Sequence, residues 1–248
     1  MDRFTRRVAA AVVLGAGLFT GPFTEAADEA APAVDLAICL DTSGSMTGLI
    51  DAARRKLWDI TNELAKARPA PRLRVALFTY GNQGHSAADG WVRLDSPFTD
   101  DLDAVYQKLF ALTTNGGTEY VGRVVRAAAE RLDWSASPKA LKLIYVAGNE
   151  SADQDREVSF RDACRGAIGR GIQVNSIFCG AAADADVAGW QEVARLADGQ
   201  YASIDQNRGT VEVATPFDRP LVELNARLNA TYIPYGADGS RGAANQSA

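Results

Sequence analysis

One short segment of the chain combines residue types that could hold a metal ion. Asp41, Ser43 and Ser45 alternate within Asp41-Thr42-Ser43-Gly44-Ser45-Met46, which directly follows an apolar run at 34–40. A turn can point one carboxylate and two hydroxyls to the same place, and the glycine between the serines permits the backbone to bend. Carboxylate and hydroxyl oxygens, without thiol or imidazole, form a donor set suited to Mg²⁺, Mn²⁺ or Ca²⁺.

The spacing of these residues leaves a second interpretation open, because Ser and Asp are also common in turns and at helix caps. Ser45 or Thr47 could simply cap the helix that follows. The downstream segment Asn115-Gly116-Gly117-Thr118 favours the metal site. It is a glycine-rich turn that offers a Thr hydroxyl just before another predicted helix.

Strands and helices are predicted to alternate along the chain. Continuous apolar runs predict buried strands, and apolar residues that recur every three or four positions predict helices. We predict strands at 34–40, 73–78, 91–94, 141–146, 172–179 and 201–204, and helices at 50–64, 102–112, 119–132, 157–170 and 187–196. Thr99 and the two acids after it are expected to open the helix at 102–112.

This alternation predicts an α/β fold with a doubly wound, Rossmann-like, mostly parallel sheet covered by helices on both faces. Ligands of such sheets bind at the carboxyl ends of the strands, near the point where the strand order reverses. The Asp41 loop directly follows the first strand and therefore lies where a binding site is expected.

Composition excludes some classes of function. The 248 residues include 26 Lys and Arg against 31 Asp and Glu, a net charge of -5, and 47% of them are hydrophobic. These values are typical of a soluble globular protein. An acidic balance argues against nucleic acid or an anionic lipid surface as the partner.

The first 26 residues are predicted to be a secretory signal peptide. Arg3, Arg6 and Arg7 precede an apolar run at 8–19, and small residues follow near the expected cleavage site at residue 26. The run is shorter than the ~20 residues of a comfortable transmembrane helix, and an uncleaved anchor is the alternative. We expect an exported, periplasmic or extracellular protein without a later segment that spans a bilayer.

Cysteine and histidine usage gives further expectations. Cys39, Cys164 and Cys179 are interpreted as small buried hydrophobes, and a disulfide between Cys164 and Cys179 is the alternative. His85 is the only histidine, which argues against a zinc site, and we expect it to be a solvated loop residue. The acidic segment 150–157 is expected to be a solvated loop and helix start.

The loop Asp41-Thr42-Ser43-Gly44-Ser45, followed in order by Gly117-Thr118, resembles the metal-ion-dependent adhesion site of the von Willebrand factor type A domain family. The resemblance covers residues 33–213, and it implies a Rossmann-like fold. It also implies a metal site held by Asp41, Ser43, Ser45 and Thr118.

The fifth ligand of that family, an Asp after the fourth strand, has no counterpart here. The chain reads Ala147-Gly148-Asn149-Glu150, so that Gly148 or Ala147 aligns with the Asp. In the family this Asp usually acts through water, so its loss need not abolish binding. Asn149, Glu150 and Asp153 are candidates for the missing oxygen. If none supplies it, Asp41 is the only anion, and the ion attracts an incoming carboxylate more strongly.

Two functional hypotheses follow. The first is an exported binding module, whose Mg²⁺, Mn²⁺ or Ca²⁺ ion accepts an Asp or Glu carboxylate from a protein partner. The alternative is a periplasmic accessory or assembly factor for a metalloenzyme or membrane complex, with the metal site degenerate. We expect no enzymatic activity, because no paired carboxylates, activated Cys or placed His support turnover. Residues 214–248 are predicted to form a last helix around 221–228 and a loose tail.

Overall fold

The computed structural model describes residues 32–68, 70–205 and 209–210. The predicted signal peptide at 1–26, the predicted helix around 221–228 and the predicted tail lie outside the described residues. The sequence-based predictions for these segments therefore stay predictions.

A mostly parallel sheet forms the centre of the described part, as predicted. Its strand order is β3-β2-β1-β4-β5-β6-β7, so the order reverses between β1 and β4. Only the pairs β2–β3 and β6–β7 are antiparallel among the described strands. The strands are β1 (Ala33–Asp41), β2 (Arg72–Tyr80), β3 (Val92–Thr99), β4 (Leu141–Gly148), β5 (Gln173–Phe178), β6 (Tyr201–Asp205) and β7 (Gly209–Thr210).

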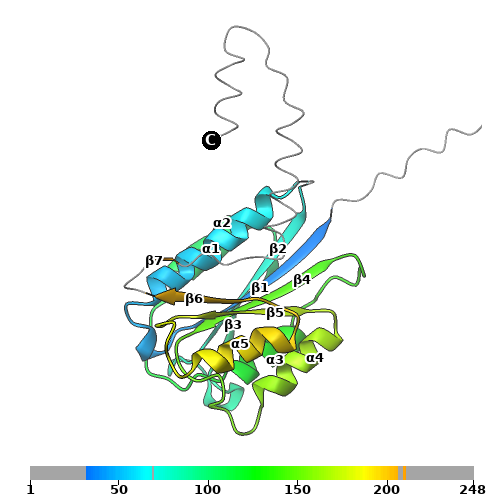
Figure 1. Cartoon of the computed structure of the whole chain (residues 1–248). Helices are drawn as coiled ribbons and strands as arrows, with labels where there is room; N and C mark the ends of the chain where they lie inside the picture. Colours follow the sequence, from blue (N-terminus) through cyan, green and yellow to red (C-terminus); the bar gives the residue numbers. More distant parts are fainter. Residues whose placement is uncertain (1–31, 69, 206–208, 211–248) are drawn as a thin grey trace, which may run out of the picture. The chain divides into compact units, whose positions relative to one another are not determined.

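Helices cover both faces of this sheet, with α1 and α2 on one face and α3, α4 and α5 on the other (Figure 1). The α-helices are α1 (Ile50–Lys66), α2 (Leu102–Phe110), α3 (Val121–Arg131), α4 (Phe160–Gly169) and α5 (Val187–Leu196). Two single 3₁₀ turns, η1 (Gly44–Met46) and η2 (Ala87–Asp89), lie in the connections. This arrangement is the doubly wound α/β fold that the sequence predicts.

The central strand β1 shows why a continuous apolar run was needed. Its side chains alternate between the two cores, with Ala37 and Cys39 on the α3–α5 face and Leu36, Ile38 and Leu40 on the α1–α2 face. All five side chains are at most 1% exposed. Because successive side chains of a strand point to opposite faces, the centre of a strand covered on both faces must be apolar at every position.

Several predicted boundaries move in the structure. The strand predicted at 91–94 is longer and antiparallel, because register shifts along β2 let an edge strand continue to Thr99. The cap of α2 is Asp101, one of the three residues predicted to open this helix: its side chain accepts a hydrogen bond from Ala104 N at 3.0 Å, and Thr99 Oγ1 accepts one from Asp101 N at 3.1 Å. The helix predicted from Glu157 begins at Phe160, because Asp155 accepts hydrogen bonds from Glu157 N and Val158 N in a preceding turn.

The three cysteines are free and buried, which confirms their interpretation as small hydrophobes. Cys39 and Cys164 belong to the core under α3–α5, whereas Cys179 belongs to the core under α1 and α2. The alternative disulfide between Cys164 and Cys179 is therefore wrong, because opposite faces of the sheet separate the two thiols.

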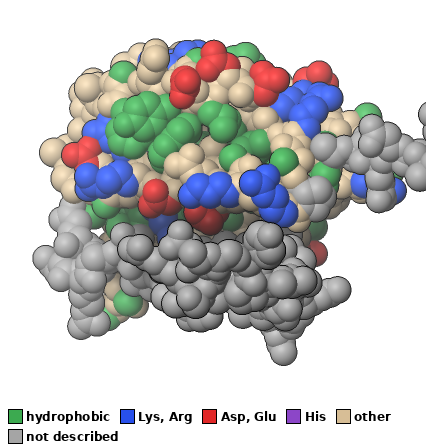
Figure 2. All heavy atoms as spheres, turned by 90° about the horizontal axis from the view of Figure 1, so that it is seen from above, with side chains coloured by type: hydrophobic (Ala, Val, Ile, Leu, Met, Phe, Trp, Pro, Cys, Tyr) green, Lys and Arg blue, Asp and Glu red, His purple; other side chains and the backbone are tan. Residues whose placement is uncertain are grey.

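Among the described helices, none is long and apolar enough to cross a bilayer. Seen from above, the molecule shows a group of hydrophobic side chains with mainly basic side chains along one border and acidic ones along the other (Figure 2). On the helices of the upper face, Tyr106 of α2 contacts the rings of Trp58 on α1 and Phe110 at centroid distances of 5.0 and 4.3 Å. These rings pack α1 and α2 together.

A buried ion pair joins the beginning of β1 to β2. Arg74 Nε and Nη2 each donate to one oxygen of Asp35 at 2.8 Å, and Ser135 N donates to the same carboxylate at 2.7 Å. Asp35 is only 1% exposed, so its charge depends on these donors. This pair fixes the register of β1 and β2 at the end of the sheet opposite the Asp41 loop.

Replacing Arg74 by Met tests this dependence. We expect Arg74→Met to lower the free energy of unfolding by about 3 kcal/mol, because it leaves a buried carboxylate without its cation. Urea denaturation measures the loss. The control is Lys66→Met, which removes an exposed ion pair with Glu63 and is expected to change stability by less than about 0.5 kcal/mol. An equal loss of stability in both variants would contradict the conclusion that the buried Asp35 depends on Arg74.

Candidate metal centre

Asp41 ends β1 with a completely buried carboxylate. Its Oδ1 accepts a hydrogen bond from Ser43 N at 2.7 Å, while its Oδ2 has no hydrogen-bond partner. Buried polar atoms of folded proteins are normally paired, so an unpaired carboxylate oxygen calls for a ligand or a cation. This oxygen is the most direct indication of a site in the described part of the chain.

Three further oxygens lie in a chain of hydrogen bonds beside Asp41. The hydroxyls of Ser43 and Ser45 are 2.9 Å apart, and Ser45 Oγ donates to Asn149 Oδ1 at 3.1 Å. The serines follow β1 and Asn149 follows β4, the two strands between which the strand order reverses. The fold thus brings Asn149, a candidate from sequence, to the Asp41 loop.

The alternative interpretation, in which Ser45 or Thr47 caps the next helix, is wrong. The helix α1 begins at Ile50, and its cap residue Leu49 provides no side-chain hydrogen bond. Thr47 Oγ1 instead lies 2.8 Å from Thr114 Oγ1. The hydroxyl of Ser45 is therefore available to the site.

The segment that carries Thr118 packs closely against the Asp41 loop. Gly44 N donates to the carbonyl of Gly116, and Gly117 adopts a φ of 145°. A side chain at residue 117 would collide with the carbonyl of Gly81 and lie 2.8 Å from Ser43 Cβ. Only glycine permits this approach, which brings the segment of half-buried Thr118 against the loop of Ser43.

The absence of the second Asp after β4 has a steric reason. A Cβ on Gly148 would lie 2.5 Å from the Tyr80 hydroxyl and 3.0 Å from the ring of Trp190. The other aligned residue, Ala147, is completely buried on the opposite face of the strand. Neither position has room for a ligating side chain, and the first residue of this loop that reaches the site is Asn149.

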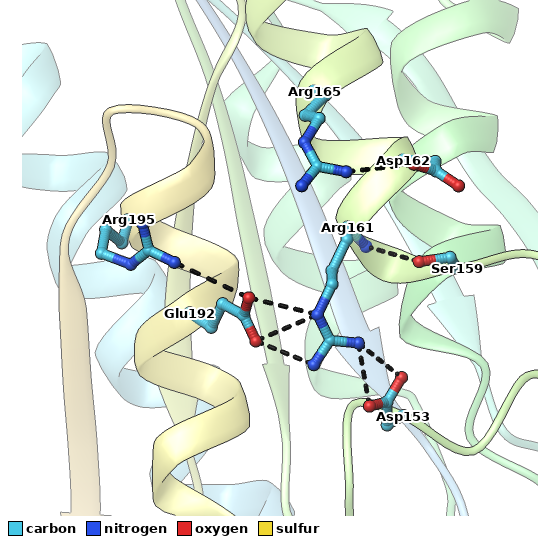
Figure 3. Close-up of polar contacts among 7 residues, drawn as sticks. All are labelled: Asp153, Ser159, Arg161, Asp162, Arg165, Glu192 and Arg195. Carbon is cyan, nitrogen blue, oxygen red and sulfur yellow. Dashed lines mark hydrogen bonds and ion pairs between the residues drawn. The ribbon is translucent and has the colours of Figure 1, made fainter.

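The remaining candidates of this loop have different surroundings. Both oxygens of Asp153 accept hydrogen bonds from Arg161 Nη1, at 3.0 and 2.9 Å, and Arg161 also binds Glu192 (Figure 3). Arg161 thereby ties the loop to α4 and α5. Glu150 Oε2 instead accepts a hydrogen bond from Gln154 Nε2 at 2.9 Å, on the side of the Asp41 loop. We therefore omit Asp153 from the proposed ligands.

Glu119 is the residue that the sequence analysis missed. It was assigned to the start of the helix at 119–132, but α3 begins at Val121, and Glu119 is only 5% exposed. Gln154 Nε2 donates to its Oε2 at 2.7 Å. Its position directly after Thr118 is the only signal in the sequence that could have identified it.

The electrostatics of the site call for a cation. Burial raises the pKa of Asp41 to about 8, the Ser43 N–H opposes the rise, and the charges of Glu119 and Glu150 add to it. Burial also raises the pKa of Glu119, against the hydrogen bond from Gln154. Several carboxyl groups are thus gathered where their ionised forms repel one another.

The donor set fits a hard divalent cation. In the described ranges no three His, Cys, Asp or Glu side chains form a metal-binding group, so hydroxyl and amide oxygens must supply part of the coordination. Asp41, Ser43, Ser45, Thr118 and Asn149 offer such oxygens, which Mg²⁺, Mn²⁺ and Ca²⁺ prefer. Bound there, the ion would neutralise the unpaired Asp41 oxygen and present open coordination positions.

Thr42, the neighbour of Asp41, is one of the residues that line a polar cleft of about 380 Å³. Arg93, Asp95, Lys108 and His85 are among the residues that line it. Contrary to the sequence prediction, His85 is not solvated but 8% exposed. It is held in place because its Nε2 lies 2.9 Å from Thr79 Oγ1.

Comparison with known proteins identifies the family. The family model of the von Willebrand factor type A domain matches residues 35–209. The chain belongs to this family, as the resemblance implied. A comparison with curated protein sequences gives no match.

Solved structures of this fold come from varied proteins. BatB of Bacteroides thetaiotaomicron superposes with a TM-score of 0.54 at 15% identity, covering 80% of this chain and 100% of BatB. Proximal thread matrix protein 1 of the mussel byssus, with a zinc-occupied MIDAS motif, gives 0.55 at 14% identity over 72% of this chain and 43% of that one. The pilus adhesin SpaC of Lactobacillus rhamnosus GG gives 0.54 at 15% identity, over 72% and 28%. These similarities establish the fold alone.

The variant Asp41→Asn distinguishes stabilisation by a bound cation from the stability of the metal-free fold. Because Asn keeps an oxygen for the Ser43 N–H but removes the buried charge, we expect the melting temperature in EDTA at pH 9, above the raised pKa of Asp41, to rise by about 2–4 °C. Excess Mg²⁺ or Mn²⁺ is expected to stabilise the wild type, by about 2.7 kcal/mol at 100 times the Kd, but not the variant. Differential scanning calorimetry measures both effects.

The control is Asp59→Asn, which changes an exposed acid on α1 and should retain the wild-type response to metal. A metal-induced shift that persists in Asp41→Asn would place the bound ion elsewhere.

The pKa of His85 gives a second prediction. Burial lowers it from the ordinary value of 6.5, the charge of Arg93 lowers it further, and Asp95 opposes the change. The Thr79 hydroxyl donates to Asp95 Oδ2 at 2.6 Å, so it accepts the Nε2–H of a neutral ring. As the pH falls, the unfolded chain takes up this proton at a higher pH than the folded protein does. His85 should therefore reduce the free energy of unfolding as the pH falls below 6.5.

Proton NMR measures this pKa without ambiguity, because the chain has one histidine. We expect a midpoint below 6.5, and the His85→Gln variant should lose stability less steeply between pH 6.5 and 5. A midpoint at or above 6.5 would contradict the buried, neutral ring.

Proposed function

We propose that this protein is an exported binding module whose divalent metal site engages a carboxylate of a protein partner. The observation that carries the proposal is the buried, unpartnered Oδ2 of Asp41 beside the hydroxyls of Ser43 and Ser45. With Thr118 and Asn149, these residues hold Mg²⁺, Mn²⁺ or Ca²⁺. An open coordination position of the ion then accepts an Asp or Glu side chain of the partner.

Three features support this function. Ser45 is exposed, so the metal faces solvent at the loop rather than an enclosed cavity. Two cationic side chains, Arg93 and Lys108, line the cleft beside Thr42, and because they outnumber its one acid, Asp95, which Arg93 binds, they favour an acidic segment next to the coordinated carboxylate. A protein with a similar fold, proximal thread matrix protein 1 of the mussel byssus, has a zinc-occupied metal-ion-dependent adhesion site.

The role is binding rather than catalysis. In this assignment Asp41 orients the loop through Ser43 N and neutralises the ion, while the serine hydroxyls fix its position. No step transfers a proton or a group. A panel of esterase and phosphatase substrates should therefore show no metal-dependent turnover, and turnover abolished by Asp41→Asn would overturn this part of the proposal.

Selection of random peptides on the immobilised protein tests the binding function. Peptides recovered in Mg²⁺ should be enriched in Asp and Glu, and EDTA or Ser45→Ala should release them, because the carboxylate binds through the ion. The control is Asp59→Asn, which should bind as the wild type does. Peptides that bind equally in EDTA would contradict the proposal and favour the metal-independent accessory or assembly factor.

A further inference from the structure

Glu119 shares one small space with the ligands proposed above. A Cβ placed on Gly81 would lie 2.6 Å from Asp41 Oδ1, 3.1 Å from Glu119 Cγ and 3.2 Å from Ser43 Cβ. Gly81 adopts a φ of 76°, so glycine both tolerates this backbone and leaves the space open. Three side chains from two loops, Asp41 and Ser43 at the end of β1 and Glu119 before α3, thus surround the same point at the carboxyl edge of the sheet.

Glu119 is also tied to a second acid. Gln154 Nε2 donates to Glu119 Oε2 at 2.7 Å and to Glu150 Oε2 at 2.9 Å. A neutral amide therefore holds two carboxylates together, although like charges repel. Glu119 is only 5% exposed to solvent, whereas Glu150 is exposed. Because Glu119 is buried, water and salt screen its interaction with a nearby ion much less than that of Glu150.

We propose that Glu119 is the second anionic residue of the metal site, acting on the ion through its charge. The inference rests on the proposed function, since it assumes that a divalent cation binds beside Asp41. It is supported independently by the buried Asp41 Oδ2, which has no partner. The described acids form no three-residue chelate, so Glu119 contributes charge near the ion rather than completing one.

This assignment changes the charge balance of the site. Gly148 has no room for an acid, because Tyr80 and Trp190 fill the space in front of it. With Asp41 alone, a bound divalent ion would keep one uncompensated positive charge. Asp41 and Glu119 together balance it, so the site holds its ion before a partner arrives. Glu119 then sets how strongly the ion attracts an incoming carboxylate.

Isothermal titration of Mn²⁺ into the protein at pH 7.5 tests the role of Glu119. We expect Glu119→Gln to weaken Mn²⁺ binding by about tenfold or more, because it removes a poorly screened charge close to the ion. Glu119→Asp, which restores the charge on a shorter side chain, should recover part of the affinity. The control Asp153→Asn, an acid engaged by Arg161 in the same loop as Glu150, should stay within about twofold of the wild type.

A melting experiment distinguishes this role from a structural one. In EDTA, Glu119→Gln should melt at or above the wild-type temperature, because it relieves repulsion with Asp41 and Glu150. With Mn²⁺ its stabilisation should be smaller than that of the wild type. A variant that melts lower in EDTA and binds Mn²⁺ normally would overturn the inference.

The outcomes separate the two proposals. If Asp41→Asn abolishes Mn²⁺ binding while Glu119→Gln binds as tightly as the wild type, the inference about Glu119 is wrong and the metal site stands. If the wild type binds no Mn²⁺, the proposed metal-dependent function is wrong, and the inference falls with it.

Discussion

A carboxylate without a partner for one of its oxygens lies at the carboxyl end of the central strand, and the rest of the site is arranged around it. Asp41 is buried because β1 is covered on both faces, yet Oδ2 has no hydrogen-bond partner. Burying a charge without compensation costs several kcal/mol, as an order of magnitude. This cost falls at the carboxyl ends of β1 and β4, where the strand order reverses and a ligand can reach the loop.

Close backbone packing builds the site around that carboxylate. Gly117 and Gly81 allow the loops after β2 and α2 to approach Ser43, so that backbone segments far apart in the sequence lie together. Arg161 on α4 holds the loop after β4 by binding Asp153 of that loop and Glu192 of α5. The ligands therefore depend on contacts between loops, while the sheet beneath them supplies a rigid support.

The departure from the family pattern after β4 has a physical explanation. Residue 148 faces Tyr80 and Trp190, whose side chains occupy the volume that an Asp would need. The oxygen nearest to Ser45 in that loop belongs to Asn149, a neutral ligand. Negative charge is concentrated instead on the side of Glu119 and Glu150, which changes how an ion at this site would be balanced.

Apolar periodicity and local spacing are properties of contiguous residues, so they were enough to predict the alternation of strands and helices, the doubly wound fold and the Asp41 loop as the candidate site. Which distant side chains join that loop depends on how the segments pack in three dimensions. Asn149 meets Ser45 and Asp153 turns to Arg161, although both follow the same strand. Glu119 and His85 were misjudged for the same reason: their burial depends on segments far away in the chain.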